Sequence, residues 1–404
     1  MTRDPSAVRS ERPPHILPVL VLAQLAGTSL WFTGNAVVGD LRAALGFGPE
    51  AIGWMTSAVQ LGFIAGTLAM ALLAIPDRFS SRRLFLTFSL CGAAANLGLL
   101  VAESLAWVLL ARFATGVCLA GIYPIGMRIA ASWYREGLGR AIGYLVGAVV
   151  LGTAVPHLLR AAGAGAPWQS VVLGVSLFAA LGGVVQAVLV PEGPHLRARG
   201  KLRADAIPKL FRVSGFRASA FGYFGHMWEL YTFWTFVPVL LGLYAASHGA
   251  AHISVSLWSG LVIGVGGIGC AGGGLLVQHF GSARVAGVQL AASGLCCLLA
   301  PFLMGAPLPI FLGYLLLWGV VVAGDSPQFS TLNAQSAPPE LVGTGLAIAV
   351  SIGFALTIAS IELANVLQLW LELPVVLAFL AVGPALGLLG LRPLLRQNAS
   401  GGPG

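Results

Sequence analysis

The chain alternates long apolar runs with short polar stretches from one end to the other. A helix needs about 20 apolar residues to cross the hydrocarbon core of a bilayer, and twelve runs of roughly that length can be marked. Their predicted bounds are 15–39, 51–76, 83–102, 104–127, 139–160, 168–190, 215–243, 253–278, 285–304, 308–331, 342–369 and 374–393. The pattern therefore predicts an all-α integral membrane protein with twelve transmembrane helices.

The longest polar stretch between two spans lies midway along the chain, at 191–214, and it is rich in charge and proline. It predicts a linker between two six-helix bundles, 15–190 and 215–393. Short tails, 1–14 and 394–404, complete the chain. The first apolar run follows several arginines, but it is too long for a signal peptide and lacks a small-residue cleavage pattern near its end. We therefore expect it to be the first transmembrane helix.

Composition excludes a soluble domain. Of the 404 residues, 57% are hydrophobic and 9% are charged, against about 25% charged in soluble domains. Lys and Arg number 22, and Asp and Glu 14. If both termini are cytoplasmic, 19 of the 22 cations lie on that side, with only Arg42 and Arg160 outside and Arg112 within a span. The positive-inside rule then predicts a multi-pass protein of the cell (inner) membrane with both termini in the cytoplasm, and no nucleic-acid partner.

The chain shows no pattern for a cofactor or a metal. All five cysteines lie inside apolar runs without the spacing of a metal site or a disulfide framework; they are Cys91, Cys118, Cys270, Cys296 and Cys297. The seven histidines are scattered. The glycine-rich eighth run has no P-loop lysine and no preceding strand, which argues against nucleotide binding. We therefore expect no cofactor, and a catalytic constellation typical of a membrane enzyme is not visible.

The two halves repeat each other. DRFSSRR at 77–83 lies between the second and third predicted spans, and QHFGSAR at 278–284 lies between the eighth and ninth. A second pair of segments, GIYPIGM and GDSPQFS, aligns Pro124 with Pro327 at nearly the same offset. Duplication of a six-span unit in parallel orientation is typical of secondary transporters.

These residues resemble the major facilitator superfamily, whose loop between helices two and three carries the pattern G-x-x-x-D-R-x-G-x-R-R. The matching positions are Asp77, Arg78, Arg82 and Arg83 in the first half and Gly274, Gly281 and Arg284 in the second. Leu73 and Ser80 replace the two glycines of the first half, and Gln278 replaces the acid of the second. The family's helix-four pattern, an arginine followed four residues later by glycine, is met by Arg112 and Gly116.

The resemblance implies a twelve-helix transporter that moves a small-molecule substrate across the lipid bilayer by alternating access, as a monomer and without a cofactor. The family's helix-five antiporter pattern begins with Gly143 and Gly152 but ends in Pro156 and His157 in place of Gly-Pro. We therefore expect a proton-coupled symporter of a small organic solute in the uptake direction. A uniporter, an efflux antiporter or a porter of a small inorganic anion remains the alternative.

The loop motif supplies the candidate gating residues, which are Asp77, Arg78, Arg82, Arg83 and Arg284. Charges at these positions can bridge the ends of neighbouring helices, and breaking such contacts can accompany the rocking of one half against the other. The alternative is that they serve only to orient the chain in the membrane.

Four ionisable residues in the second half are candidates for proton coupling. Glu229 lies near the middle of the seventh predicted span, and His226 is on the same helical face. A charge facing lipid at that depth costs about 2.5–3.5 kcal/mol, so Glu229 should face a cavity or a partner. The structural alternative is a protonated Glu229 bonded across a helix interface. Asp325, beside Pro327, is either a second proton site or a helix cap, and the role of Glu362 stays open.

The candidate substrate-binding residues are polar or aromatic groups within predicted spans. They are Arg112, Asn35, Gln60, Asn96, His157, Tyr223, Trp228, Tyr231 and Trp234. Arg112 suits an anionic group, or else it forms an ion pair with an acid such as Glu103 or has a structural or proton-relay role. The neutral polar residues are alternatively bonds between helices, and the aromatic residues alternatively packing.

Overall fold

The computed structural model describes residues 13–134, 137–195 and 206–399. Every regular element in this part of the chain is a helix, and twelve of the segments are long and apolar enough to cross a membrane. The predicted all-α architecture with twelve spans is confirmed. Parts of the two predicted tails and of the linker, including several of the cations assigned to the cytoplasm, lie outside the described residues.

The first six spans form the N-terminal half. Its helices are α1 (Ile16–Thr28), η1 (Ser29–Phe32), α2 (Thr33–Ala36), α3 (Val38–Leu45), α4 (Ala51–Leu72), α5 (Ile75–Arg78), α6 (Ser81–Leu97), η2 (Gly98–Val101), α7 (Leu105–Leu119), α8 (Tyr123–Trp133), α9 (Leu138–Ala162) and α10 (Gln169–Leu189). The first span is not one continuous α-helix, because η1 is a short 3₁₀ segment between α1 and α2. The fourth span consists of α7 followed by α8.

The other six spans form the C-terminal half. Its helices are α11 (Ala206–Arg212), α12 (Ser214–Ser247), α13 (Val255–Gly264), α14 (Gly266–Phe280), α15 (Ser282–Leu303), α16 (Leu308–Gly324), α17 (Ser326–Ser336), η3 (Pro339–Leu341), α18 (Val342–Leu367), α19 (Leu373–Phe379) and α20 (Val382–Ala399). The short helix α11 belongs to the predicted linker. Three spans are divided, as α13 with α14, α16 with α17, and α19 with α20.

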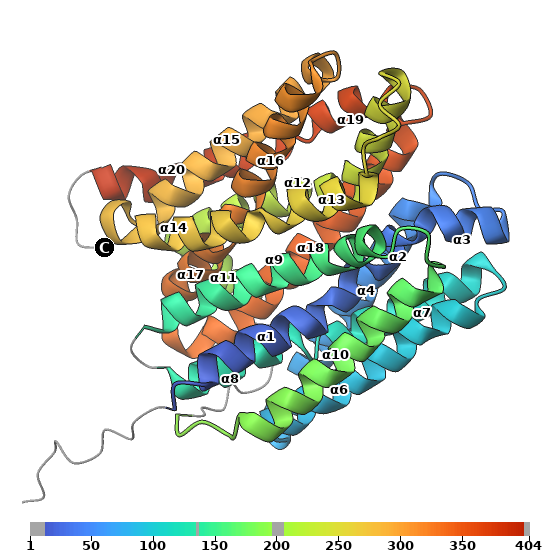
Figure 1. Ribbon diagram of the computed structural model, residues 1–404. Helices are drawn as coiled ribbons and strands as arrows, with labels where there is room; N and C mark the ends of the chain where they lie inside the picture. The colour runs from blue at the N-terminus through green and yellow to red at the C-terminus, as the bar shows by residue number, and fades with distance from the viewer. Residues whose placement is uncertain (1–12, 135–136, 196–205, 400–404) are drawn as a thin grey trace, which may run out of the picture.

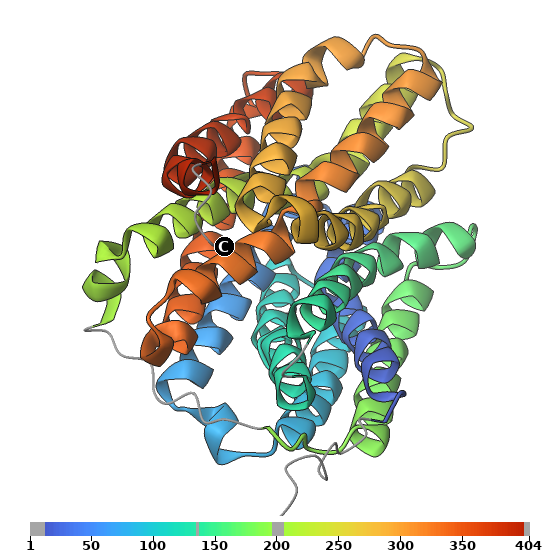
Figure 2. The same cartoon turned by 90° about the vertical axis from the view of Figure 1, so that its left-hand side faces the viewer.

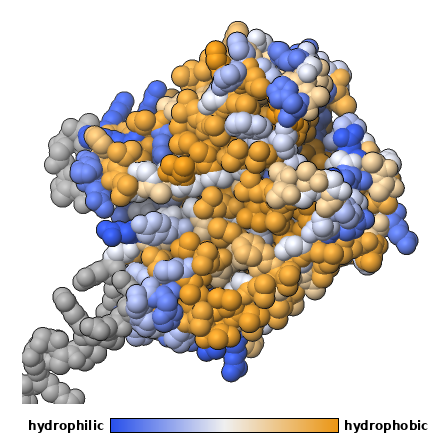
Figure 3. Space-filling model, viewed as in Figure 1, coloured by the Kyte–Doolittle hydropathy of each residue, from blue (hydrophilic) through white to orange (hydrophobic). Residues whose placement is uncertain are grey.

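The two halves lie side by side, as Figures 1 and 2 show from two directions. Helix α1 begins and α20 ends on the same side of the bundle, at the left of Figure 1, and we call this end the terminal face. The other end is the opposite face. Apolar residues cover much of the flank between the two faces, and polar residues gather towards the ends (Figure 3). Such a surface suits a protein whose sides contact lipid.

The aligned prolines of the repeat mark equivalent breaks in the two halves. Pro124 lies in the first turn of α8, and Pro327 lies in the first turn of α17. Proline lacks a backbone N–H but is tolerated in the first turn of a helix, so each proline permits the span to restart after a break. Both spans consequently extend several residues beyond their predicted ends.

Contact between the halves is tight near the opposite face and ends towards the terminal face. Helix α9 packs on α13 and α14, and α4 packs on α18. A Cβ placed on Gly267 would lie 3.5 Å from the carbonyl oxygen of Gly147, across the interface. A Cβ on Gly143 or Gly274, nearer the terminal face, would meet no described atom within 4 Å. Helices α9 and α14 therefore separate on the terminal side of this crossing.

Candidate functional site

Glu229 is fully buried in the C-terminal half, at the middle of α12. Its Oε2 accepts a hydrogen bond of 2.5 Å from the hydroxyl of Ser293 on α15, and its Oε1 accepts one of 2.6 Å from the indole N–H of Trp318 on α16. Each carboxyl oxygen thus has a donor from a neighbouring helix. The side chain joins three helices of one half, which is the arrangement predicted as facing a partner.

His226 and Asp325 form a second buried acidic site, one helical turn from Glu229 along α12. The two side chains are 1% and 0% exposed, and His226 Nδ1 lies 2.8 Å from Asp325 Oδ1. The other ring nitrogen of His226 lies 2.7 Å from the hydroxyl of Ser326. Asp325 occupies the junction of α16 and α17 but makes no side-chain capping bond, so its side chain contacts the histidine and does not cap the helix.

An imidazole and a carboxyl group in contact carry a net charge of −1, 0 or +1, depending on the number of protons bound. A change of charge has large effects where water is scarce, because electrostatic interactions are strong in a medium of low dielectric constant. The pair also lies at the break between α16 and α17. Its protonation state can therefore influence the joint between two helical segments.

Glu362 lies elsewhere, at the contact between the two halves. Its Oε1 accepts a hydrogen bond of 2.5 Å from Ser57 of α4, and its Oε2 accepts one of 3.2 Å from Asn365. Asn365 also donates to the backbone carbonyl of Glu50, at the start of α4. These residues form a polar bridge between α4 and α18 near the opposite face, away from His226 and Glu229.

Six buried aromatic side chains from both halves meet between the bundles, and we call them the aromatic layer. They are Trp31, Phe32 and Phe63 from the N-terminal half and Tyr231, Trp234 and Phe354 from the C-terminal half. The ring centroids of Phe63 and Phe354 are 4.5 Å apart. Trp31 stacks on Phe354 at 5.6 Å. The aromatic layer therefore fills the space between the halves at mid-depth.

The predicted aromatic candidates do not all lie together. Tyr231 and Trp234 belong to the aromatic layer, and their rings are 5.3 Å apart. Tyr223 lies two turns nearer the terminal face and packs against Gly353 of α18. Trp228 instead packs against Gly383 of α20. The indole of Trp228 thus points between α12 and α20, and it does not share the position of the other three.

Arg112 is fully buried in the N-terminal half, where its partners are two backbone carbonyls and a side-chain amide oxygen. Its guanidinium donates to the carbonyl of Leu30 at 3.1 Å, to the carbonyl of Trp31, and to Asn96 Oδ1 at 3.4 Å. The two carbonyls belong to η1, the 3₁₀ segment of the first span. Among the described residues, Arg112 therefore supports the first span and forms no ion pair with Glu103, which corrects one of the predicted alternatives.

The neutral polar candidates mainly form bonds between helices. Asn35 donates to Thr56 at 2.8 Å, and Asn96 donates to Ser176 at 3.0 Å. Gln60 differs because it contacts the aromatic layer, accepting a bond from the Trp31 indole at 3.2 Å. His157 is buried, and its Nε2 has no hydrogen-bond partner in the described part of the chain.

Among the candidate gating residues, Asp77 forms an ion pair with Arg128. The Asp77 carboxylate, in α5, lies 2.8 Å from the guanidinium of Arg128, in α8, and this pair is largely buried. Arg128 also donates to the hydroxyl of Ser81 at 3.3 Å. The contact joins the loop motif to α8 within the N-terminal half. Four other predicted gating residues have exposed side chains, namely Arg78, Arg82, Arg83 and Arg284.

The sequence profile of the Major Facilitator Superfamily matches residues 19–361. The chain belongs to this superfamily. It is thus a membrane transporter and not an enzyme, as the resemblance of its loop motif and repeat implied.

Solved structures of superfamily members share the fold. The proton:xylose symporter XylE, bound to 6-bromo-6-deoxy-D-glucose, superposes with a TM-score of 0.72 at 14% sequence identity, covering 94% of this chain and 95% of that one. The human organic anion transporter MFSD10 (TETRAN) gives a TM-score of 0.65 at 16% identity, covering 94% of this chain and 100% of that one. No curated protein sequence matches the chain. At these identities the two structures show a common superfamily fold.

Sequence reasoning missed the partners that position the candidate groups. Ser293, Trp318 and Arg128 lie on other helices, 51 or more residues from the acid that each contacts. Serine and tryptophan are ordinary residues of a membrane helix, and an arginine just after a predicted span, as Arg128 is, is an ordinary topological signal. These contacts become visible only when the helices are packed together.

Proposed function

We propose that the chain is a proton-coupled symporter that takes up a small organic solute by alternating access. The observation that carries the proposal is the buried contact between His226 and Asp325, with Glu229 one helical turn away. Ionisable groups at membrane depth are costly and commonly mark ion or proton pathways. Three such groups, two on α12 and one at the junction of α16 and α17, therefore point to proton binding in the C-terminal half.

The proton sites adjoin an element suited to conformational change. Asp325 joins α16 to α17, and its backbone carbonyl accepts hydrogen bonds from Gln328 and Phe329 in the first turn of α17. Discontinuous helices near the bilayer midplane form ion and substrate sites in many secondary transporters. We propose that protonation at this joint changes the packing of α17 against α12 and thereby couples proton binding to the movement of the halves.

The substrate site of the proposal lies between the halves, at the aromatic layer. Two buried donors of this region, Gln60 Nε2 and Trp234 Nε1, have no hydrogen-bond partner among the described residues. Aromatic faces and donors together suit a neutral, zwitterionic or cationic organic solute with hydrogen-bonding groups. Both terminal nitrogens of Arg112 already donate to acceptors within the N-terminal half, and its Nε has no partner among the described residues. The engaged terminal nitrogens argue against its use for a small inorganic anion.

The terminal face is the cytoplasmic face in this proposal, because most of the 22 Lys and Arg residues belong to segments at that end. Contact between the halves near the opposite face then corresponds to an inward-facing arrangement. A symporter in this arrangement exchanges solute and protons with the cytoplasm.

The two similar structures support different versions of the proposal. XylE is described as a proton:xylose symporter, which favours proton coupling, whereas MFSD10 is described as an organic anion transporter. The buried acids of α12 and α16 favour the first version for this chain. A uniporter needs no titrating group, so it is the main competing function.

The experiment begins with a thermal-shift screen of small organic solutes on the purified protein, since a specific ligand raises the unfolding temperature by mass action. The best ligand is then tested in proteoliposomes that contain a pH-sensitive dye. We expect the parent to move protons together with the solute, and the Asp325→Asn variant to lose this proton movement. Glu103→Gln, which removes an exposed acid near the opposite face, is the matched control. Solute uptake by the parent without proton movement would show a uniporter instead.

A further inference from the structure

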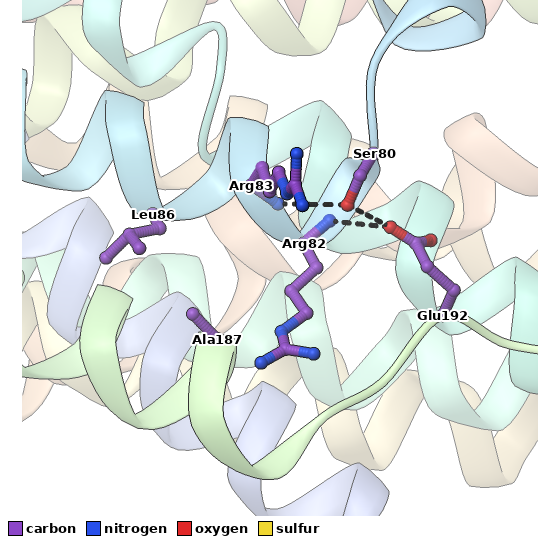
Figure 4. A pocket seen from close by; sticks show the side chains of 6 residues that line it. All are labelled: Ser80, Arg82, Arg83, Leu86, Ala187 and Glu192. Atoms are coloured by element: carbon purple, nitrogen blue, oxygen red, sulfur yellow. Dashed lines mark hydrogen bonds between the residues drawn. The ribbon is translucent and has the colours of Figure 1, made fainter.

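A separate pocket opens at the terminal face of the N-terminal half, between α6 and the segment that follows α10 (Figure 4). Its volume is about 360 Å³. It is lined by Ser80, Arg82, Arg83, Leu86, Ala187 and Glu192. The pocket lies within one half, so it is distinct from the space between the halves where we place the transported solute.

The polar wall of the pocket is asymmetric. The Ser80 hydroxyl donates to Glu192 Oε1 at 2.5 Å, and the backbone N–H of Arg82 donates to the same oxygen at 3.2 Å. The guanidinium of Arg82 extends to the other side, towards Ala187 (Figure 4). Two guanidinium groups and one carboxylate line the pocket, so its net charge is positive. The Arg82 side chain presents several N–H donors in a planar fork.

Apolar side chains continue from the pocket towards the middle of the membrane. Leu86 lines the pocket, and Leu90, one turn further along α6, is exposed. On α10, Val184 and Val188 are one turn apart and both exposed, Val188 by 67%. Helices α6 and α10 pack against each other, and the surface over α10 is mostly hydrophobic in Figure 3. The two helices thus form an apolar strip that leads up to the arginines.

We propose that this pocket binds the headgroup of an anionic phospholipid. The phosphate contacts the guanidinium of Arg82, and the acyl chains lie along the apolar strip of α6 and α10. Arginine recognises phosphate oxygens through paired N–H donors, and basic pockets beside transmembrane helices bind acidic lipid headgroups. A soluble anion would use the arginines but would gain nothing from the strip, so the strip favours a lipid.

The test measures binding of phosphatidylglycerol to the purified full-length protein in detergent. We expect Arg82→Gln to weaken binding about tenfold, the typical effect of losing one charge-assisted hydrogen bond. Arg392→Gln removes an exposed arginine from the same face of the other half, and it should leave binding unchanged. Glu192→Gln should strengthen binding about threefold, because it removes a nearby negative charge while its amide oxygen can still accept from Ser80.

Three results would overturn the proposal. The first is equal binding of phosphatidylglycerol and phosphatidylcholine by the parent. The second is an equal effect of the Arg82 and Arg392 substitutions. The third is displacement of the lipid by millimolar inorganic phosphate whose own binding depends on Arg82, which would indicate a soluble-anion site. If Arg82→Gln fails to fold, Glu192→Gln decides, since misfolding cannot produce a gain of affinity: a gain supports the lipid site and no gain overturns it.

Discussion

Ser57 of the N-terminal half donates a 2.5 Å hydrogen bond to the carboxylate of Glu362 in the C-terminal half. The two residues are 305 positions apart in the sequence. Their bond lies close to the bridge from Asn365 to the backbone of Glu50. Polar contacts therefore hold α4 against α18 at the closed end of the space between the halves.

Breaking this bridge should favour opening at the opposite face. Glu362→Ala removes the acceptor of Ser57 and Asn365, and a hydrogen bond to a charged group contributes about 1.5–3 kcal/mol. We expect the open population to rise by about tenfold or more. Spin labels at Glu103 and Trp370, exposed positions on the two halves, report the separation when attached in a Cys91→Ser background.

The control for this experiment is Ser247→Ala, which removes a hydroxyl that bonds within the end of α12. It should leave the label distances unchanged. An unchanged distance distribution in Glu362→Ala would mean that the bridge does not hold the halves together, and that the aromatic layer and the glycine contacts are sufficient.

Glu229→Gln should separate solute exchange from proton-driven accumulation. The amide keeps the shape of the side chain and can still accept a hydrogen bond from Trp318, but it cannot bind and release a proton. We expect the variant in proteoliposomes to lose accumulation driven by a pH gradient while it continues to exchange solute. Accumulation equal to that of the parent at every pH would make Glu229 structural and leave coupling to Asp325 and His226.

The pair of Asp77 and Arg128 should matter more for transport than the exposed arginines of the same motif. Each substitution removes a charge that the other residue contacts at 2.8 Å in a largely buried position, and the loss of one member of a buried ion pair is destabilising. We expect Asp77→Asn and Arg128→Ala to lower the transport rate roughly tenfold at normal expression, and Arg78→Ala to have little effect. Equal rates in all three variants, measured in proteoliposomes, would leave this motif a purely topological role.

The orientation of the chain is testable in whole cells. Single cysteines at Ser247, near the opposite face, and at Lys209 in α11 should differ in their reaction with a membrane-impermeant thiol reagent. The positive-inside rule predicts labelling of residue 247 from outside and protection of residue 209. Labelling of residue 209 on intact cells would reverse the assignment of the two faces.

The spans were predictable because a membrane helix has to be predominantly apolar over about 20 residues, whatever its neighbours are. Breaks within spans were only partly predictable. Pro327 pointed to the junction at Asp325, since proline limits where a helix can continue. The 3₁₀ segment at Ser29–Phe32 was not predicted. Its backbone carbonyls accept hydrogen bonds from the guanidinium of Arg112 on another helix, and no local sequence pattern indicates this partner.

The candidate sites were predictable as residue types but not as pairs. His226 and Asp325 stood out as ionisable groups in separate apolar runs, yet their contact depends on how α12 packs against α17. Trp228 and Trp234 looked equivalent along the sequence. Six residues of an α-helix make one full turn and about 240° more, so the two side chains point to different faces of α12. One tryptophan therefore meets α20 and the other enters the aromatic layer.

The crossing of α9 and α14 is close at Gly267, where an added Cβ would lie 3.2 Å from Cγ of Leu151 and 3.5 Å from the carbonyl oxygen of Gly147. A leucine at position 267 would clash sterically with Leu151 and with the backbone of Gly147. The leucine would therefore disfavour the arrangement in which α9 and α14 are in contact, relative to one in which the two helices are further apart. Gly267 is thus a suitable position for a substitution that favours the form open at the opposite face, for example when that form is sought for imaging.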